Sequence, residues 1–255
     1  MIALITGASG GIGAELARLF AADGFSLVLA ARSEEKLASL KAELEAAYGV
    51  RVFNLVQDLS ESGSAARVVG FVKAKALTID VLVNNAGFGD WGFFSESALE
   101  KQRKMMQLNM VTLTELTHYF LPDMLERKSG RILNVASVAG FMSGPKMAVY
   151  YASKAFVRSF TEALSVEVRT TGVTVTALCP GPVSTDFWNR AEAGDSSLFK
   201  HLAFADAKNV ARCGYKALQR GKVLAVPGVA TKCFVLLSKL LPRAWVRALV
   251  YLIQR

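Results

Sequence analysis

Cysteine and histidine are scarce in this sequence, which has three cysteines and two histidines among 255 residues. The cysteines, Cys179, Cys213 and Cys233, form no CxxC pair, and this excludes a disulfide scaffold and a thiolate zinc cluster. Because His118 and His201 have no companion at ligand spacing, an imidazole metal site is not expected either. We therefore predict a protein without a metal site in a reducing compartment, the cytoplasm.

Acidic residues are absent between Lys216 and Arg255, a segment that contains eight basic residues. Since the whole chain has a net charge of +9, the first 215 residues carry only +1. A nucleic-acid-binding domain needs a basic face on its folded body, so we expect no nucleic-acid partner. Met1 leads directly into a short apolar run without a basic leader, so no signal peptide is expected.

Short apolar runs alternate with helical stretches along most of the chain. Strands are expected at 2–6, 26–31, 50–57, 81–84, 130–135 and 174–179, and helices at 11–23, 34–48, 62–76, 99–125 and 149–170. Strands that are apolar on both faces and separated by helices indicate a parallel sheet that is covered on both sides. We predict one α/β domain over residues 1–255, a doubly wound (Rossmann) parallel sheet of about seven strands with helices on both faces.

A glycine-rich segment, TGASGGIG at 6–13, follows the first expected strand and precedes a helix. Gly7, Gly11 and Gly13 let the backbone turn tightly and approach a pyrophosphate at the N-terminus of that helix. A glycine-rich segment alone is a weak signal, but the strand–turn–helix context favours a dinucleotide site over an ordinary turn.

The end of the second expected strand carries Arg32. NAD sites usually place an acidic residue there to hold the ribose 2′-hydroxyl. A guanidinium instead suits a 2′-phosphate through bidentate hydrogen bonds. Glu34 and Glu35 lie close by but belong to the next helical turn. The alternative is that Arg32 is an ordinary surface arginine in contact with solvent. We predict that the cofactor is NADP, with NADPH preferred over NADH.

Three further segments follow expected strands or open a helix: NNAG at 84–87, NVAS at 134–137 and YYASK at 150–154. Tyr150 and Lys154 are one helical turn apart, so their side chains project from one face. Together with the glycine-rich loop, Asp58, Asn109 and PGPVST at 180–185, these segments resemble the short-chain dehydrogenase/reductase family over roughly residues 2–186.

The resemblance implies a nicotinamide dinucleotide site. With Arg32 included, the expected cofactor-binding residues are Gly7, Ser9, Gly11, Ile12, Gly13, Arg32, Asp58, Asn85, Ala86, Gly87, Tyr150, Lys154, Pro180, Gly181, Val183 and Thr185. In the family pattern, Asp58 meets the adenine amino group, Asn85 borders the adenosine and nicotinamide side, and Thr185 holds the nicotinamide carboxamide.

The resemblance also implies hydride transfer to a carbonyl, or from a secondary alcohol, with Asn109, Ser137, Tyr150 and Lys154 as catalytic residues. Ser137 can hydrogen-bond the substrate oxygen, and Tyr150 can donate the proton. Free tyrosine has a pKa of about 10, and we expect the Lys154 ammonium and the oxidised nicotinamide to favour the phenolate. In the family pattern, Asn109 links the lysine to a water chain. Tyr151 is the competing candidate, but no lysine follows it at four residues.

Two other functions are weighed against hydride transfer. A non-catalytic NADP-binding sensor or scaffold protein is expected to lose the tyrosine or the lysine, and this chain keeps both. A dehydratase or epimerase is a third possibility. The intact serine, tyrosine and lysine favour a reductase or dehydrogenase over these two.

A variable segment at 185–209 is expected to form a lid over the substrate, by resemblance to the family. Its large apolar residues are Phe187, Trp188, Leu198, Phe199, Leu202 and Phe204. The loop at 88–94, with Phe141 and Met142, is expected to form the opposite wall. So many aromatic side chains predict an apolar carbonyl substrate; the alternative is that half of them only pack the lid on the body.

The C-terminal tail, residues 228–255, reads as two apolar and basic helices, 229–241 and 245–254, which Pro242 separates. Charged residues interrupt both, so a transmembrane span is not expected. Such apolar helices must be covered, and three surfaces could cover them: the active-site cleft or a neighbouring subunit, the core of the domain, and an anionic membrane surface. We predict a homodimer or homotetramer whose tail caps the active site, with peripheral membrane contact as a secondary hypothesis.

Overall fold

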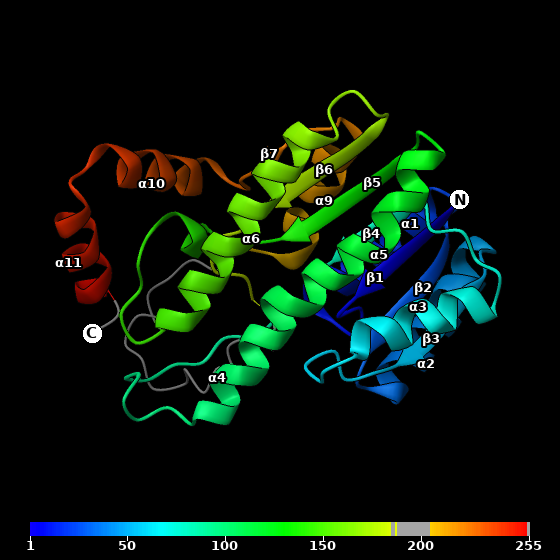
Figure 1. The fold of residues 1–255 in the computed structure, drawn as a ribbon, viewed down its shortest axis with the longest axis horizontal. Coiled ribbons are helices and arrows are strands. Elements are labelled where there is room, and N and C mark those ends of the chain that lie inside the picture. The colour runs from blue at the N-terminus through cyan, green and yellow to red at the C-terminus, as the bar shows by residue number, and fades with distance from the viewer. Residues whose placement is uncertain (185–186, 188–204, 254–255) are drawn as a thin grey trace.

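A sheet of seven parallel strands organises the computed structural model, which describes residues 1–184, 187 and 205–253 (Figure 1). The strands are β1 (Ile2–Thr6), β2 (Ser26–Ala31), β3 (Val52–Val56), β4 (Val81–Asn84), β5 (Gly130–Val135), β6 (Val173–Leu178) and β7 (Leu224–Ala225). Their order in the sheet is β3-β2-β1-β4-β5-β6-β7. The predicted doubly wound α/β fold is therefore confirmed.

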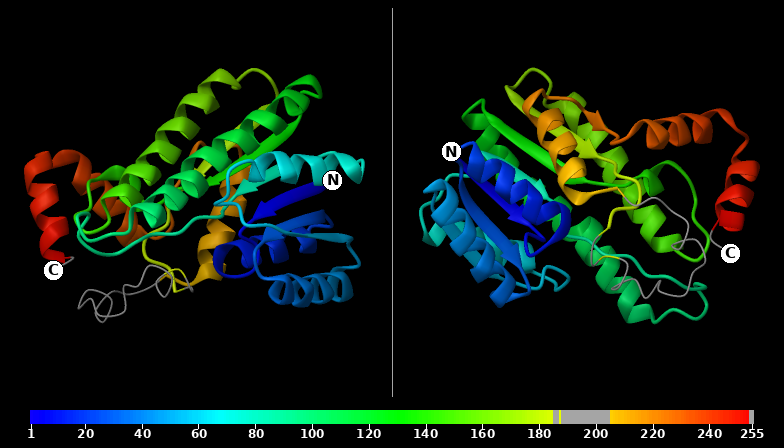
Figure 2. Two further views of the ribbon diagram at one scale, coloured as in Figure 1. Left: turned by 60° about the horizontal axis from the view of Figure 1, so that its bottom comes forward. Right: turned by 180° about the vertical axis from the view of Figure 1, so that it is seen from behind.

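Helices cover both faces of this sheet. They are α1 (Gly11–Ala22), α2 (Glu34–Tyr48), α3 (Ser64–Ala74), α4 (Leu99–Met106), the π-helix η1 (Gln107–Thr112), α5 (Leu113–Glu126), the 3₁₀-helix η2 (Val138–Phe141), α6 (Ala148–Glu167), α9 (Ala207–Gln219), α10 (Val229–Leu240) and α11 (Arg243–Ile253). Side chains of α1, α2 and α9 pack on one face, and those of α3, α5 and α6 pack on the other. Figure 1 shows α5 and α6 in front of the sheet, and the view from behind in Figure 2 shows α1 and α9.

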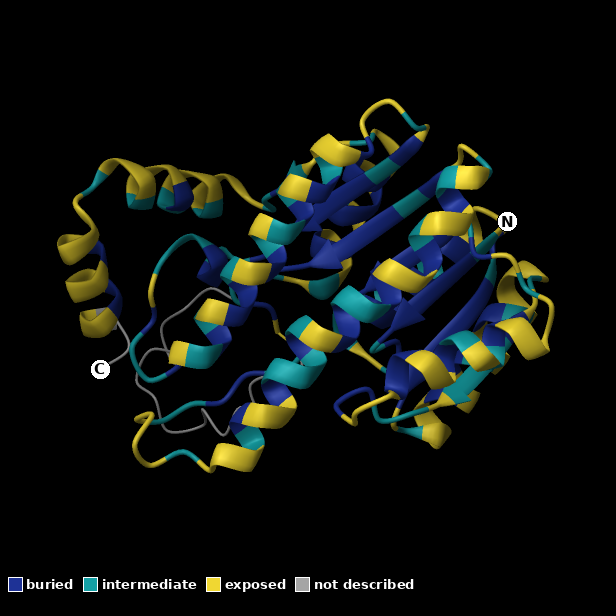
Figure 3. Cartoon of the chain, viewed as in Figure 1, coloured by how far each residue is buried: buried dark blue, intermediate teal, exposed yellow. Residues whose placement is uncertain are grey.

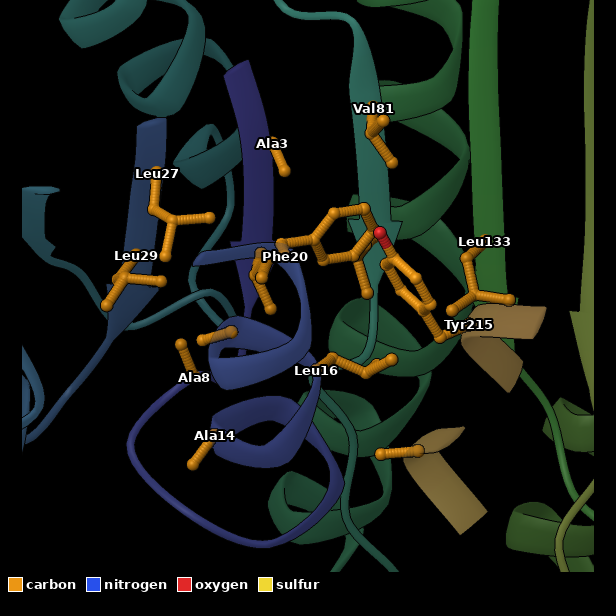
Figure 4. Packing of buried hydrophobic residues seen from close by; sticks show 14 of the residues in the cluster. Ala3, Ala8, Ala14, Leu16, Phe20, Leu27, Leu29, Val81, Leu133 and Tyr215 are labelled. Carbon is orange, nitrogen blue, oxygen red and sulfur yellow. The ribbon is translucent and has the colours of Figure 1, made fainter. Parts of the chain in front are cut away.

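The two layers of the core follow from the alternation of side chains along each strand. Ala3 and Ile5 of β1 point to the α1 face, whereas Leu4 between them points to the opposite face. On the α1 side, Phe20 packs edge-on against Tyr215 of α9, with ring centroids 4.8 Å apart (Figure 4). This contact joins the first helix to α9, more than 190 residues further along the chain.

The stretch 99–125, predicted as one helix, is divided. It runs as α4, then the π-helix η1, then α5. The wider turn of η1 contains the buried Asn109, whose side chain bonds to the backbone of Phe88. Apolar spacing in the sequence indicates helix but does not reveal such a turn. π-helical turns inside α-helices are frequent at functional sites.

The sheet reverses its winding between β1 and β4, which are neighbours. From β1 the chain continues outward to β2 and β3, then returns to β4 on the other side. In open α/β sheets, the crevice at the carboxyl ends of the strands beside such a switch point is the usual ligand site. The glycine loop follows β1 and the NNAG segment overlaps the end of β4, so both lie there.

Helices α10 and α11 extend from β7 and lie at one end of the molecule, away from the sheet (Figures 1 and 2). Pro242 separates them, as predicted. Only Val235, Val246 and Val250 are buried among the described residues of these two helices.

Candidate active site

The glycine loop after β1 is held against the NNAG segment. Gly7 has φ +65°, and a Cβ there would lie 2.9 Å from the Cα of Ala86. A Cβ on Gly13 would lie 2.4 Å from the carbonyl oxygen of Gly7. The Asn85 side-chain amide donates to the carbonyl oxygens of Thr6 (2.9 Å) and Gly7 (3.2 Å). Glycine is therefore required at 7 and 13 by close packing, and Asn85 ties the two loops together.

The N-terminus of α1 points to the same place. No side chain of the described residues caps this helix, whose N-cap is Gly10. Its first backbone N–H groups are thus available to an anion, and the helix dipole favours negative charge there. Ser9, Gly11 and Ile12 line the adjoining cavity.

A cavity of about 930 Å³ collects most of the predicted site residues. Those that line it are Gly7, Ser9, Gly11, Ile12, Arg32, Asp58, Asn85, Ala86, Gly87, Ser137, Tyr150, Lys154, Pro180, Gly181 and Val183. Gly13 and Asn109 do not line it: Gly13 is packed behind the glycine loop, and Asn109 lies in η1. Thr185 falls outside the described residues.

Arg32 and Asp58 face each other at the ends of β2 and β3, with Nη1 and Oδ2 3.9 Å apart. The Arg32 side chain is 60% exposed, so this pair contributes little to stability. Burial raises the pKa of Asp58, but hydrogen bonds from the Ser60 hydroxyl and backbone N–H, with the Arg32 charge, outweigh it and lower that pKa overall. The guanidinium lies at the rim of the cavity, where it can contact a ligand.

Ser137 and Tyr150 meet inside the cavity. The Ser137 hydroxyl donates to the Pro180 carbonyl at 3.4 Å and accepts from the Ala139 N–H at 3.1 Å. Burial raises the pKa of Tyr150 well above its ordinary value of 10, and a hydrogen bond with the Ser137 side chain acts in the opposite direction. Burial alone therefore favours the protonated phenol, and the expected effect of the oxidised nicotinamide on the pKa of Tyr150 stays a prediction.

Lys154 lies one turn along α6 from Tyr150, with Nζ 5.8 Å from the centroid of the tyrosine ring. The ammonium donates to the Val135 carbonyl at 2.8 Å. Burial lowers the pKa of Lys154 to about 8, so the side chain is still mostly charged at neutral pH. This cation stands beside the ring on which a negative charge would develop.

Asn109 supports the site from behind. Its amide donates to the Phe88 carbonyl at 3.0 Å and to the Ser153 hydroxyl at 3.1 Å, and its oxygen accepts from the Phe88 N–H at 3.2 Å. Ser153 in turn donates to the Tyr150 carbonyl at 2.7 Å. The structure thus connects η1 to the backbone that carries the tyrosine.

The substrate side of the cavity is largely apolar. Phe88, Trp91, Met142, Met147, Tyr151 and Phe187 line it. Of the wall expected from the loop at 88–94 with Phe141 and Met142, the structure places Phe88, Trp91 and Met142 at the cavity, whereas the expectation is wrong for Phe93, Phe94 and Phe141. Phe93 and Phe94 are exposed, and the Phe141 ring lies instead against Arg158 and Lys239. Trp188, Leu198, Phe199, His201, Leu202 and Phe204 fall outside the described residues.

The tail reaches the same cavity. Ala230, Thr231 and Phe234 of α10 and Val250 of α11 are among its lining residues. The sequence leaves three contact surfaces open for the tail. The structure shows that the side of the tail with these four residues lies at the active-site cleft of its own chain.

Several lining residues were not singled out from the sequence. They are Gln57, Leu59, Ser60, Leu108 and Met147. The first three surround Asp58 after β3, so their position beside that residue was a usable signal. Leu108 and Met147 are ordinary apolar residues at helix boundaries, and nothing in the pattern distinguishes them from core residues.

Comparison with known proteins places the chain among oxidoreductases. A family model described as short chain dehydrogenase matches residues 1–196. An uncharacterized oxidoreductase of Staphylococcus saprophyticus is 34% identical over 219 residues, which cover 86% of this chain and 91% of that protein. The very-long-chain 3-oxoacyl-CoA reductase of Laccaria bicolor is 37% identical over 175 residues, 68% of this chain but only 52% of that protein.

Two solved structures share the fold at full length. A short-chain dehydrogenase from Sphingobium yanoikuyae in complex with NADPH has a TM-score of 0.84 and 32% identity, covering 93% of this chain and 92% of that one. A short-chain dehydrogenase/reductase from Burkholderia phymatum in complex with NAD has a TM-score of 0.80 and 30% identity, covering 92% of each chain.

Proposed function

The chain belongs to the short-chain dehydrogenase/reductase family of oxidoreductases, and on that premise we propose that it transfers hydride between NADP and a carbonyl compound or its secondary alcohol. One observation carries the proposal. Ser137, Tyr150 and Lys154 converge on the same cavity as the glycine loop and the N-terminus of α1. Groups for binding a dinucleotide and for moving a proton are thus combined in one site.

The residues present fit a nicotinamide dinucleotide. The crowded glycines leave the backbone free to approach a pyrophosphate, and the uncapped α1 N-terminus supplies N–H donors. When bound, the nicotinamide supplies or accepts the hydride. Asp58, with its lowered pKa, stays ionised and can accept a hydrogen bond from an adenine amino group.

The proton steps belong to the side chains. In the reducing direction, Ser137 hydrogen-bonds the carbonyl oxygen, and the Tyr150 hydroxyl gives its proton to that oxygen as negative charge develops there. The Tyr150 oxygen keeps the bonding electrons as a phenolate, which the Lys154 ammonium stabilises. The oxidising direction reverses each transfer. Since burial raises the pKa of Tyr150, neighbouring positive charge is needed to bring it into the working range.

The preference for NADP rests on Arg32. Its exposed guanidinium at the end of β2 suits a 2′-phosphate better than an unmodified ribose. The NADPH complex of the Sphingobium protein supports this choice, whereas the Burkholderia protein binds NAD, so the family fold alone does not decide it.

An apolar substrate is supported by the walls of the cavity. Aromatic and methionine side chains dominate the cavity wall next to Tyr150. The rings of Tyr150 and Phe187 are tilted relative to each other, with centroids 5.4 Å apart. Pockets of this composition bind hydrophobic ligands and fix them with a few polar groups. The activity named for the Laccaria relative, reduction of very-long-chain 3-oxoacyl-CoA, points to the same class of compound.

We extend the proposal to the whole chain as one domain in a cytoplasmic homo-oligomer, with residues 185–209 as the substrate lid and 228–255 as the tail. Free cysteines at all three positions are compatible with a reducing compartment. Tyr119 of α5 is exposed, as are Phe156 and Val166 of α6. These are two of the three helices that cover one face of the sheet. Apolar side chains on such a surface favour contact with a second copy.

Substitution of the two adjacent tyrosines tests the catalytic assignment. Tyr150→Phe should bind cofactor normally but lower turnover by about 10²–10⁴, because it removes the proton donor. Tyr151→Phe is the matched control and should leave the chemical step nearly unchanged. Carbonyl reduction followed by NADPH absorbance over a panel of ketones, aldehydes and acyl thioesters measures both. Equal losses in the two variants, or wild-type turnover in Tyr150→Phe, would contradict the assignment of Tyr150. A wild type that binds NADPH but reduces no compound of the panel would favour a non-catalytic NADP-binding protein.

A further inference from the structure

The tail carries a set of large apolar side chains that point away from the rest of the molecule. They are Val229, Leu236, Leu237, Leu240, Trp245, Leu249 and Leu252, and we call them the outer face. Trp245 is 67% exposed and Leu240 is 73% exposed. Figure 3 shows both helices mostly in the colour of exposed residues, with buried positions only on the side toward the body. Contiguous exposed apolar patches on a soluble domain mark interaction sites.

The outer face is additional to the side by which the tail is anchored. On α10, Phe234 and Val235 face the body, and Lys239 lies over the Phe141 ring at 5.3 Å. On α11, Val246 and Val250 are buried. Each helix therefore has two apolar sides, and within the described part of the chain only one of them is packed against the body.

The spacing on α11 is that of a helix lying at an interface. Trp245, Leu249 and Leu252 follow one another at intervals of four and three residues, so they form one stripe. Arg243 and Arg247 occur on the same helix, and no acidic residue occurs in either helix. At 100° per residue, these arginines lie on the side of α11 opposite the stripe. A helix with tryptophan and leucine on one side and arginine on the other is typical of helices that lie in the headgroup region of a bilayer.

Charge favours a lipid surface over a second tail. The segment from Lys216 to the C-terminus has eight basic residues and no acidic one, whereas the rest of the chain is nearly neutral. Two tails packed together would place two basic segments without acidic residues side by side, which is unfavourable. An anionic bilayer instead offers an apolar layer for the leucines and negative headgroups for the lysines and arginines.

We propose that the outer face of the tail docks on the surface of an anionic lipid bilayer. Among the described residues, no helix combines the length and the apolar character that crossing a membrane requires. The contact is thus peripheral, with α10 and α11 lying along the headgroups.

This orientation places the active-site cavity next to the lipid. Phe234 and Val250 line the cavity from the inner side of the same two helices, and a helix with its side chains is about 10 Å across. Given the function proposed above, on which this step rests, the substrate class becomes carbonyl compounds or alcohols that partition into membranes and enter beside the tail.

Vesicle binding tests the docking surface without using activity. The full chain is mixed with vesicles of phosphatidylglycerol and phosphatidylcholine, or of phosphatidylcholine alone, and the bound fraction is measured by flotation. The wild type should bind the anionic vesicles, and binding should weaken as salt is raised. Leu249→Ser/Leu252→Ser should lower the partition coefficient by about tenfold or more, because two partly inserted side chains are lost. Val56→Ser/Leu99→Ser is the matched control, since it removes two exposed apolar side chains from the body.

A second pair of variants tests the charge. Lys232→Gln/Arg247→Gln should weaken binding to anionic vesicles by about 30-fold, which corresponds to about 1 kcal/mol for each of the two charges. Lys216→Gln/Arg220→Gln is the matched control, because it also removes two positive charges, one from α9 and one from its C-cap. It should weaken vesicle binding less. Sedimentation without lipid must show one mass for all of these proteins.

Three results would overturn the proposal. They are wild-type protein that stays unbound, equal binding of tail and control variants, and a lower oligomer mass in Leu249→Ser/Leu252→Ser. The last result would assign the outer face to a second copy of the chain. Vesicle binding without any carbonyl reduction would remove the proposed function and leave the docking surface intact.

Discussion

At the scale of single residues, the preference for a cofactor depends on the charge at the end of β2. Arg32→Asp should erase or reverse a preference for NADPH over NADH of about 1–3 kcal/mol, because it replaces a phosphate-binding cation with a repelling anion next to Asp58. Fluorescence titration of both cofactors measures the effect. Arg51→Asp, an equal change of charge at an exposed position, is the control. Tighter binding of NADH to the wild type would contradict the assignment.

Burial of Lys154 should make stability depend on pH in a predictable direction. Its pKa is about 8 in the folded protein and 10.5 ordinarily, so between these values the unfolded chain binds more protons at this group. The free energy of unfolding therefore rises with pH across this range. The wild type should gain about 3 kcal/mol relative to Lys154→Met between pH 8 and 10.5. Urea unfolding at several pH values measures this.

The exposed Lys208 provides the control for that experiment. The difference between the wild type and Lys208→Met should be flat over the same pH range. A flat difference for Lys154→Met as well would mean that the ammonium is not buried in solution.

The motifs predicted most individual site residues because their chemistry needs particular residue types. Glycines before a helix and a tyrosine four residues before a lysine have few other reasons to occur together. The exact place of Gly13 and Asn109 could not be predicted. Gly13 is required by the carbonyl of Gly7, and Asn109 by the backbone of Phe88, and both are tertiary contacts that a linear pattern does not contain.

At the scale of elements, Asn109 connects η1 to Phe88 and to α6. Asn109→Leu should lower the free energy of unfolding by about 2–4 kcal/mol, because it leaves the Phe88 N–H and carbonyl and the Ser153 hydroxyl without this partner in a buried place. Leucine has a similar volume, so the loss reports hydrogen bonds more than packing. Val111→Ala, in the same helix but exposed, should cost far less, and similar losses for the two would contradict this role.

Strong local patterns allowed the central strands and most helices to be predicted, whereas β7 and α9 were not. β7 has only two residues, Leu224 and Ala225, which is too short for a periodic signal. α9 is different, because Val210, Ala211, Gly214, Tyr215 and Leu218 form a buried stripe at helical spacing. That pattern was present in the sequence and is sufficient to predict a helix.

At the scale of the whole molecule, the tail covers a site that other segments build. Truncation after Gly228 should leave NADPH affinity nearly unchanged, because the glycine loop, Arg32 and Asp58 follow β1, β2 and β3 and are not part of the tail. KM for apolar substrates should rise by about tenfold, since the contacts of Phe234 and Val250 are lost. Phe234→Ala in the full chain should reproduce part of the increase. An equal loss of cofactor affinity would show that the tail supports the fold instead.

The destination of the tail could not be derived from its sequence, for a physical reason. Each helix has apolar residues on two sides, so the periodicity does not say which side faces the body. Only the folded chain shows that Val246 and Val250 are buried while Trp245 and Leu249 are exposed.

The order of strands in the sheet also has a consequence for synthesis on the ribosome. The strands that carry the dinucleotide half, β1 to β4, and the helix that carries Tyr150 and Lys154 are translated before β7 and the tail. A nascent chain can therefore assemble its nucleotide-binding half while α10 and α11 are still unmade. The wall that α10 and α11 contribute to the substrate cavity is then added to a nucleotide-binding half that is already formed.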